Sequence, residues 1–148
     1  MTRPLFLLAL LGLAVPTALA QDAEADSAAI RATAMDYLMG YYEGDEARME
    51  RAIHPDLAKR IMRRAPDGRS RLDVMSSLSL VRLASGGSGR QIPEDERVIE
   101  IHILDIEGDN ASVKTFATGF FDYMHLTRVG EGWQILNVLW DFTPSPGD

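Results

Sequence analysis

The 148-residue chain contains no cysteine. Disulfide bonds and thiolate metal sites are therefore excluded, as is a lipid anchor on an N-terminal cysteine. The three histidines, His54, His102 and His125, are scattered, and none has the paired spacing of metal ligands. We therefore expect no metal and no cofactor, and the hydrophobic core alone must stabilise the fold.

The chain also lacks an excess of positive charge. It has 15 Lys and Arg against 22 Asp and Glu, a net charge of -7. Because proteins that bind phosphate backbones gather basic residues, we expect no nucleic-acid partner. One basic cluster surrounds an expected turn, and we interpret it as a solvated hairpin tip rather than an anion site. Its members are Lys59, Arg60, Arg63, Arg64, Arg69 and Arg71.

The only long apolar run lies at the N-terminus. Arg3 precedes the run from Leu5 to Val15, and Pro16 and Ala18-Leu19-Ala20 follow it. This order is typical of an export signal, and the run is too short to span a bilayer core of roughly 30 Å. We expect a signal peptide over residues 1–20 and a single domain over residues 21–148. The protein would be periplasmic or secreted, and not bound to a membrane after signal removal.

Helical patterns fill the first half of the remaining chain. Residues 21–26 are small and acidic and are expected to be frayed. A helix is predicted from Ser27 to Gly44, a second after the capping residue Asp45, and a third from Ser76 to Gly86. On the first helix, apolar residues recur on one face, and they are Ile30, Ala34, Tyr37, Leu38 and Tyr41.

Strand patterns dominate the second half. Pro66-Asp67-Gly68 predicts a hairpin turn, and alternating residues predict a strand from Val98 to Ile106. Residues 111–129 are expected to form one long strand with a bend or bulge near Gly119, and a last strand runs from Trp133 to Phe142. Helices first and antiparallel strands last predict an α+β fold with the helices on one face of the sheet.

Three segments together resemble a known family. They are His54 to Arg60, Phe121 to Leu126 and Gly132 to Trp140, in that order. The chain resembles the putative lumazine-binding branch of the NTF2-like superfamily over nearly all of its length after the expected signal, from Tyr37 through Trp140. The resemblance implies a cone, in which a strongly curved antiparallel sheet packs on N-terminal helices, and it leaves open a homodimer through the sheet. The superfamily includes dehydratases, isomerases, cyclases and proteins that only bind, so the fold does not decide the function.

Polar residues on the last two strands are the candidates for a site. Alternation places Trp133, Ile135 and Asn137 on one face, with Leu136, Val138 and Trp140 on the other. In similar proteins the Trp133 face turns inward. A buried Asn137 amide must be hydrogen-bonded, and it would either tie the sheet together or contact a ligand.

The strand from Phe121 to Thr127 carries the acid/base candidates. Tyr123 and His125 share one face and Asp122 lies on the other. His125 could serve as a general base with Tyr123 as hydrogen-bond donor, or Asp122 could be the base if burial raised its pKa. The alternative for all three residues is ordinary packing and local hydrogen bonding.

Three functional hypotheses follow. The leading one is an exported domain that binds a small, partly apolar molecule in the cone between the first helix and the sheet. Its ligand-binding candidates are Tyr41, Tyr123, His125 and Asn137. The second is a cofactor-independent lyase or isomerase of the dehydratase or isomerase type, which uses His125 or Asp122 as base. The third is a scaffold or dimerisation module, whose outer sheet face carries Trp140, Phe116 and Phe120.

Overall fold

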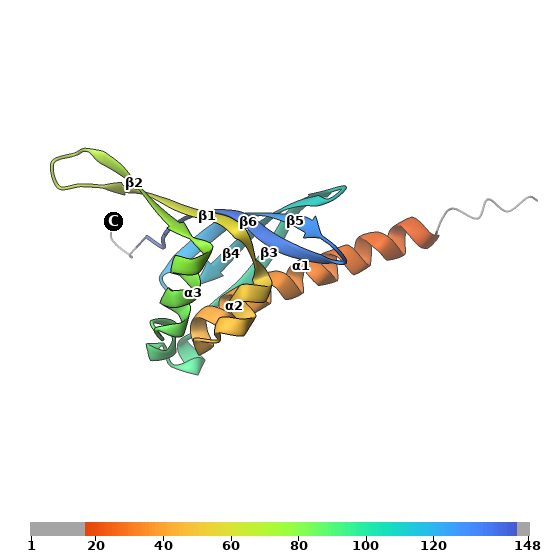
Figure 1. Ribbon diagram of the computed structural model, residues 1–148, viewed down its shortest axis with the longest axis horizontal. Coiled ribbons are helices and arrows are strands. Elements are labelled where there is room, and N and C mark those ends of the chain that lie inside the picture. The colour runs from red at the N-terminus through yellow and green to blue at the C-terminus, as the bar shows by residue number, and fades with distance from the viewer. Residues whose placement is uncertain (1–16, 145–148) are drawn as a thin grey trace, which may run out of the picture.

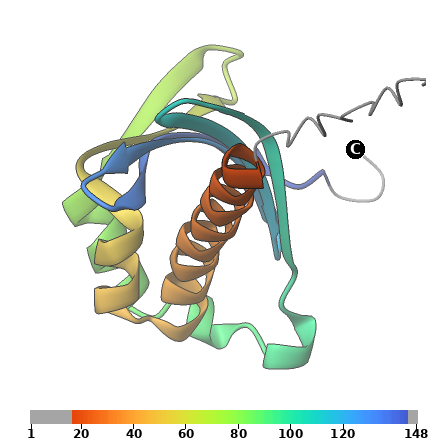
Figure 2. The ribbon, with the colours of Figure 1, turned by 90° about the vertical axis from the view of Figure 1, so that its right-hand side faces the viewer.

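The computed structural model describes residues 17–144, with side chains from residue 22 onward. One curved, open sheet covers three helices, which all lie on its concave side (Figures 1 and 2). The helices are α1 (Thr17–Glu43), α2 (Glu46–Ala52) and α3 (Ser77–Ser85), followed by the 3-10 turns η1 (Gly89–Gln91) and η2 (Glu94–Glu96). The strands are β1 (Ile53–Arg64), β2 (Ser70–Ser76), β3 (Ile99–Glu107), β4 (Asn110–Ala117), β5 (Phe120–Val129) and β6 (Gly132–Phe142). The predicted α+β class and curved sheet are confirmed.

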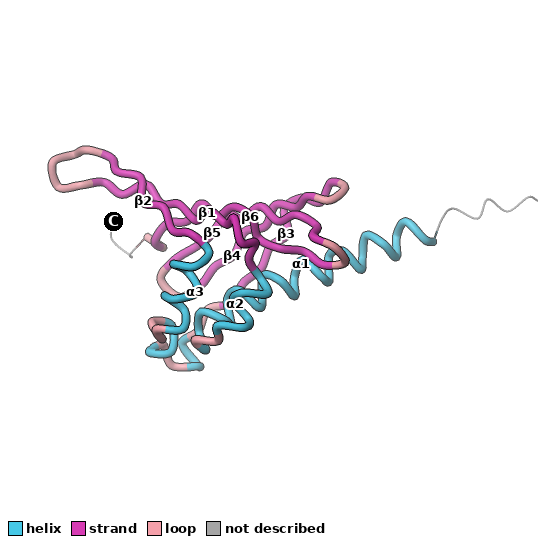
Figure 3. The backbone as a smooth tube through the Cα atoms, viewed as in Figure 1, coloured by secondary structure: helices cyan, strands magenta, loops and turns pink. Residues whose placement is uncertain are grey.

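The sheet is mixed rather than wholly antiparallel. Its strand order is β2-β1-β6-β5-β4-β3, and the neighbours β1 and β6 run parallel. Figure 3 distinguishes the strands of this sheet from the helices beneath them. The other neighbouring strands are joined by tight hairpins and are antiparallel. Many elements lie between β1 and β6 in the sequence, namely β2, α3 and strands β3 to β5. No short turn therefore connects β1 to β6, and nothing forces these two strands to be antiparallel.

The α1 helix is longer than the sequence pattern suggested. Residues 21–26, expected to be frayed, lie inside it. Asp26 accepts two hydrogen bonds of 2.7 Å from Arg128 on β5 and one of 3.4 Å from the Trp133 indole on β6. The Arg128 hydrogen bond also holds the pKa of Asp26 below its ordinary value. These tertiary contacts stabilise a helical turn that the local sequence alone does not.

The predicted signal peptide falls mostly on residues 1–16, outside the described part of the chain. It therefore stays a prediction, as does export. Within residues 17–144 no helix is both long and apolar enough to cross a membrane.

Apart from the start of α1, local signals correctly predicted the helix ends. Gly44 has a positive φ of 64° directly after α1. Asp45 then caps α2 by accepting a 3.0 Å hydrogen bond from the Arg48 amide, and Ser76 caps α3 in the same way through the Ser79 amide. Each cap satisfies a backbone donor that the first helical turn leaves unpaired.

The expected single strand from residue 111 to 129 is wrong. The chain instead forms two antiparallel strands, β4 and β5, joined by a tight turn at Thr118 and Gly119. Gly119 has a φ of 86°, a conformation that favours glycine. The Tyr42 hydroxyl accepts a 2.8 Å hydrogen bond from the Thr118 amide and donates one of 2.8 Å to the Val98 carbonyl. The turn is thereby attached to α1.

A one-residue bulge in β6 changes which side chains face the helices. His125 pairs with Asn137 and Leu126 with Ile135, so Leu136 is the extra residue. Before the bulge, Trp133 and Ile135 point inward. After it, the inward residues are Val138, Trp140 and Phe142, which is the opposite register from simple alternation.

Gly89 allows a close approach between η1 and α1. A Cβ at this position would lie 2.3 Å from the Tyr41 carbonyl oxygen, whereas one at Gly132 would meet nothing within 4 Å. We predict that Gly89→Ala lowers the free energy of unfolding by about 1–3 kcal/mol, because backbone must move to admit the methyl group. Gly132→Ala should leave it unchanged within about 0.5 kcal/mol. Urea denaturation of both variants checks this, and equal midpoints would contradict it.

Candidate functional site

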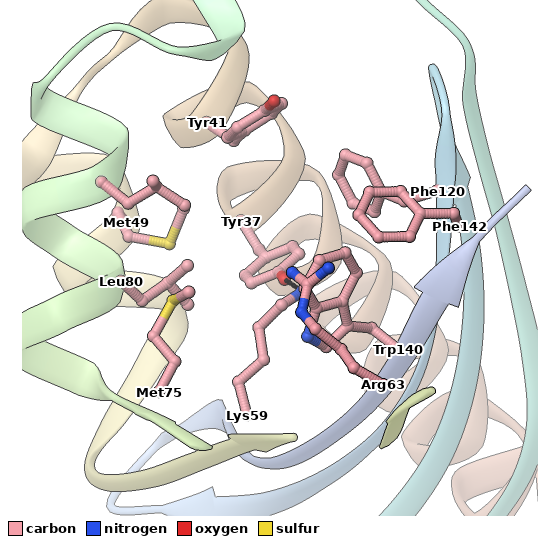
Figure 4. A pocket seen from close by; sticks show the side chains of 11 residues that line it. Tyr37, Tyr41, Met49, Lys59, Arg63, Met75, Leu80, Phe120, Trp140 and Phe142 are labelled. Atoms are coloured by element: carbon pink, nitrogen blue, oxygen red, sulfur yellow. Dashed lines mark hydrogen bonds between the residues drawn. The ribbon is translucent and has the colours of Figure 1, made fainter. Parts of the chain in front are cut away.

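A cavity of about 250 Å³ opens between α1, α3 and the concave face of the sheet (Figure 4). Its wall is mostly aromatic and aliphatic. The lining residues are Tyr37, Tyr41, Met49, Lys59, Arg63, Met75, Leu80, Leu83, Phe120, Trp140 and Phe142. We call this cavity the pocket.

Helix α1 and strand β6 supply the aromatic walls. Tyr37 and Tyr41 lie four residues apart, one turn along the same face of α1. Trp140 and Phe142 point into the pocket only because the Leu136 bulge reverses their face of β6. The bulge at Leu136 therefore determines that β6 presents aromatic side chains to the pocket.

A buried polar cluster closes the inner end of the pocket. Lys59 of β1 donates hydrogen bonds to the Asp122 carboxylate of β5 and, at 2.6 Å, to the Tyr37 hydroxyl. Tyr37 and Thr115 each donate to Asp122 at 3.5 Å. Lys59 is 5% exposed and Asp122 is 0% exposed, so the ion pair is removed from water.

Burial and pairing act in opposite directions on these groups. Burial lowers the pKa of Lys59 while the Asp122 carboxylate opposes that change. Burial likewise raises the pKa of Asp122, which the Lys59 ammonium opposes. The pKa of Tyr37 is raised well above its ordinary value by burial and by Asp122, so its hydroxyl remains protonated. Because the Lys59 amine donates hydrogen bonds to the Asp122 carboxylate and to the Tyr37 hydroxyl, we assign it as an ammonium in an ion pair.

Aromatic rings surround the Lys59 ammonium. Its Nζ lies 4.9 Å from the ring centre of Trp140, 5.3 Å from that of Tyr37 and 5.4 Å from that of Phe120. Such distances allow cation–π attraction, which adds to the hydrogen bonds in holding a charge away from water.

The rim of the pocket carries a second cation. The Arg63 guanidinium lies 5.9 Å from the ring centre of Trp140 and 5.4 Å from that of Phe142. It donates a 2.8 Å hydrogen bond to Asp73, which also pairs with Arg71. Opposite them Tyr41 packs edge-on against Phe120, and burial raises the pKa of its hydroxyl.

The predicted site residues are divided between the two faces of the sheet. Tyr41 lines the pocket, and Asp122 faces the same side but lies behind Lys59 and Tyr37. Tyr123 and His125 are exposed on the outer face, as the alternation with buried Asp122 and Met124 requires. The expectation that Tyr123 and His125 lie inside the cone is therefore corrected.

Asn137 is also on the outer face. The bulge at Leu136 turns it outward, where it borders a shallow hollow together with His125. Asn137, Tyr123 and His125 therefore cannot contact a ligand in the pocket. If Asp122 were the base and Tyr123 the hydrogen-bond donor, the two side chains would lie on opposite faces of the sheet. The lyase or isomerase mechanism that relied on Tyr123 loses its geometric basis.

The expected aromatic surface for dimerisation is likewise corrected. Trp140 and Phe120 line the pocket, and only Phe116 faces outward, beside Phe121 and Tyr123. Within residues 17–144, no three His, Asp or Glu side chains gather as a metal site would require.

Lys59 is a pocket residue that the sequence analysis did not place in a site. It was assigned with the basic cluster to a solvated hairpin tip, but only the arginines around it are exposed. Two signals were available in the sequence. Lys59 shares its strand face with Leu57 and Ile61, and it is one of just two lysines, with Lys114, among 15 basic residues.

Comparison with known proteins identifies the architecture. A model of the family described as putative lumazine-binding matches residues 25–141. No curated protein sequence matches the chain.

Three solved structures resemble this one at low sequence identity and therefore show the fold alone. An NTF2-like protein from Shewanella baltica OS155 has 20% identity and a TM-score of 0.62, over 88% of this chain and 100% of that one. One from Novosphingobium aromaticivorans, described as having a cystatin-like fold, has 16% identity and a TM-score of 0.62, over 92% and 95%. A ketosteroid isomerase-like protein from Erwinia carotovora atroseptica has 17% identity and a TM-score of 0.55, over 80% and 96%.

The buried ion pair generates a stability prediction. Lys59→Met leaves the Asp122 carboxylate buried without its counter-ion, so we expect the free energy of unfolding to fall by about 3–5 kcal/mol. The double variant Lys59→Met/Asp122→Asn should recover most of that loss, because no unpaired charge remains. Lys114→Met, at the other lysine, should cost less than about 1 kcal/mol. Urea denaturation measures all three, and a full-sized loss in the double variant would contradict the pairing.

Proposed function

This chain belongs to the putative lumazine-binding family of NTF2-like proteins, and we propose that it binds a small, partly apolar molecule in the pocket between α1, α3 and the sheet. One observation carries the proposal. The cavity has aromatic and aliphatic walls and a single buried polar cluster at its inner end. Small-molecule sites generally combine an apolar concave wall with a few fixed polar groups.

The composition of the pocket wall favours a ligand-binding site over a packing defect in the hydrophobic core. Trp140, Phe142 and Leu83 are large apolar side chains that border open space, and Phe142 and Leu83 are partly exposed. Covering such surface with an apolar ligand body is favourable, at roughly 25 cal/mol for each Å² removed from water. The family's description also names a small molecule.

The position of Asp122 favours binding without turnover. As a general base Asp122 would need to reach a ligand, but its carboxylate accepts hydrogen bonds from Lys59, Tyr37 and Thr115 and lies behind the first two. A base held in an ion pair and shielded from the pocket is poorly placed to take a proton from a ligand.

Native mass spectrometry of the protein from its own host tests both the ligand and the export proposal. We expect the chain to begin at Gln21, after removal of the signal, and to carry an additional small-molecule mass that is lost on denaturation. Ligand-free protein that still contains residues 1–20 would count against both proposals.

A pocket-blocking variant tests the location. Leu83 lies at the mouth of the pocket, whereas Leu78 lies on the same helix outside it. Both leucines are exposed, so a larger ring at either position fits without repacking the core. Leu83→Trp should lower the ligand-bound fraction at least about tenfold by filling the mouth, and Leu78→Trp should leave it unchanged. Equal bound fractions in the two variants would place the ligand elsewhere.

We also propose that two copies pair through the outer face of the sheet. Exposed apolar side chains gather there on neighbouring strands, in register with one another. They are Met62, Leu72, Val74, Tyr123 and Leu139. Exposed apolar area of this kind on the outer face of a sheet favours association with another surface. A second copy of the chain carries the same exposed face and is present wherever the protein is. Contacts between two identical faces give a dimer with two-fold symmetry.

Light scattering after size exclusion measures the oligomeric state. We expect a dimer for the unmodified protein and a monomer for Leu139→Glu, since a carboxylate at the centre of this face would be buried on pairing. Leu78→Glu, on α3, should remain dimeric. A monomer at every concentration for the unmodified protein would contradict the pairing.

A further inference from the structure

Lys59 has a hydrogen-bond donor left over at the inner end of the pocket. A lysine ammonium carries three N–H donors. Two of them go to Asp122 and Tyr37, and among the described residues no third acceptor lies within hydrogen-bond distance. Because Lys59 itself lines the pocket, its remaining donor is available to a molecule that enters there (Figure 4).

The charge around that donor is already balanced. The Asp122 carboxylate neutralises the Lys59 ammonium, and both are removed from solvent. A carboxylate brought to the inner end would lose its hydration without finding a net positive charge, and a cation would meet the ammonium directly. A neutral acceptor loses much less on desolvation and still gains a hydrogen bond to a charged donor.

The excess of positive charge lies at the rim, not at the inner end. Arg63 and Arg71 share the single carboxylate of Asp73, and these arginine side chains are 45% and 74% exposed. Water screens charges at such positions, so they attract anions only weakly. The inner end therefore sets the polar group of the ligand.

The walls set the rest of the ligand. The rings of Tyr37, Phe120 and Trp140 surround the ammonium, and the side chains of Met75 and Leu80 face them across the cavity (Figure 4). A ring system can stack on or edge against these rings while its polar atom reaches inward.

We infer that the pocket takes an uncharged cyclic or aromatic carbonyl compound, whose carbonyl oxygen accepts the third hydrogen bond of Lys59. This inference rests on the proposed function and specifies the chemical class of its ligand. Tyr37 and Asp122 act as positioning residues, since they orient the ammonium and balance its charge.

Three naphthalene probes of similar shape separate the polar groups. They are 2-acetylnaphthalene, which has a ketone, 2-isopropylnaphthalene, which has no acceptor, and 2-naphthoate, which is an anion. Equilibrium dialysis against the full mature chain at neutral pH gives the three dissociation constants. We expect the ketone to bind about tenfold more tightly than either of the others, as one hydrogen bond to a charged donor implies.

Two variants tie the preference to Lys59. In Lys59→Met/Asp122→Asn, which removes the donor without leaving a buried charge, the ketone should bind no better than the hydrocarbon. Lys114→Met, at the chain's other lysine, should retain the preference. The infrared carbonyl stretch of bound 2-acetylnaphthalene gives an independent readout. It should shift to lower frequency in the unmodified protein and return to its position in an apolar solvent in the double variant.

The outcomes distinguish this inference from the proposed function. Equal binding of ketone and hydrocarbon, or a preference that survives in the double variant, would overturn the role of Lys59 and leave an apolar pocket. Tightest binding of 2-naphthoate would overturn it in favour of an anion site at the arginines. Failure of all three probes to bind would contradict both the inference and the pocket as a small-molecule site.

Discussion

The ion pair between Lys59 and Asp122 is the interaction on which the site depends. It joins β1 to β5 across the intervening strand β6, and Tyr37 adds α1 to the same cluster. Removing two charges from water costs several kcal/mol per ion, and well-packed apolar residues would often serve stability as well or better. The contribution of the pair is to fix the position of the Lys59 ammonium at the end of an apolar cavity. Tyr37 and Thr115 also donate hydrogen bonds to Asp122, and so they hold the carboxylate that anchors the ammonium.

The cavity itself follows from the shape of the sheet. The sheet curves over α1, and α3 closes the side where β1 and β2 extend beyond the other strands (Figure 1). The bulge at Leu136 then turns Trp140 and Phe142 inward at the end of β6, where they form the wall opposite α3. Without the bulge, Leu139 and Asp141 would face the helices, and the wall would be smaller and partly charged. A single extra residue thus sets the chemistry of the pocket.

Features encoded by neighbouring residues could be predicted from the sequence, and features that depend on distant contacts could not. The caps at Asp45 and Ser76 were identified because cap and helix lie within one turn of chain. The inward turn of Trp140 and the outward turn of Asn137 were missed, because a bulge is settled by the register with β5 and leaves no local mark in the sequence. Lys59 was placed in a solvated tip because its partner Asp122 is 63 residues away. Residues 21–26 were expected to be frayed for the same reason, since the residues that stabilise them are distant in the sequence. Arg128 and Trp133 hold this part of α1 through hydrogen bonds to Asp26.

The chain contains two lysines, and this permits a direct test of the central claim that one of them is a buried, paired ammonium at the end of the pocket. Nuclear magnetic resonance of the lysine side chains observes both, with Lys114 as the internal reference. We predict slowly exchanging ammonium protons for Lys59 at neutral pH, with nuclear Overhauser contacts to the rings of Tyr37 and Trp140, and fast exchange for Lys114. Two lysine signals with equally fast exchange and no contact to those rings would contradict the account.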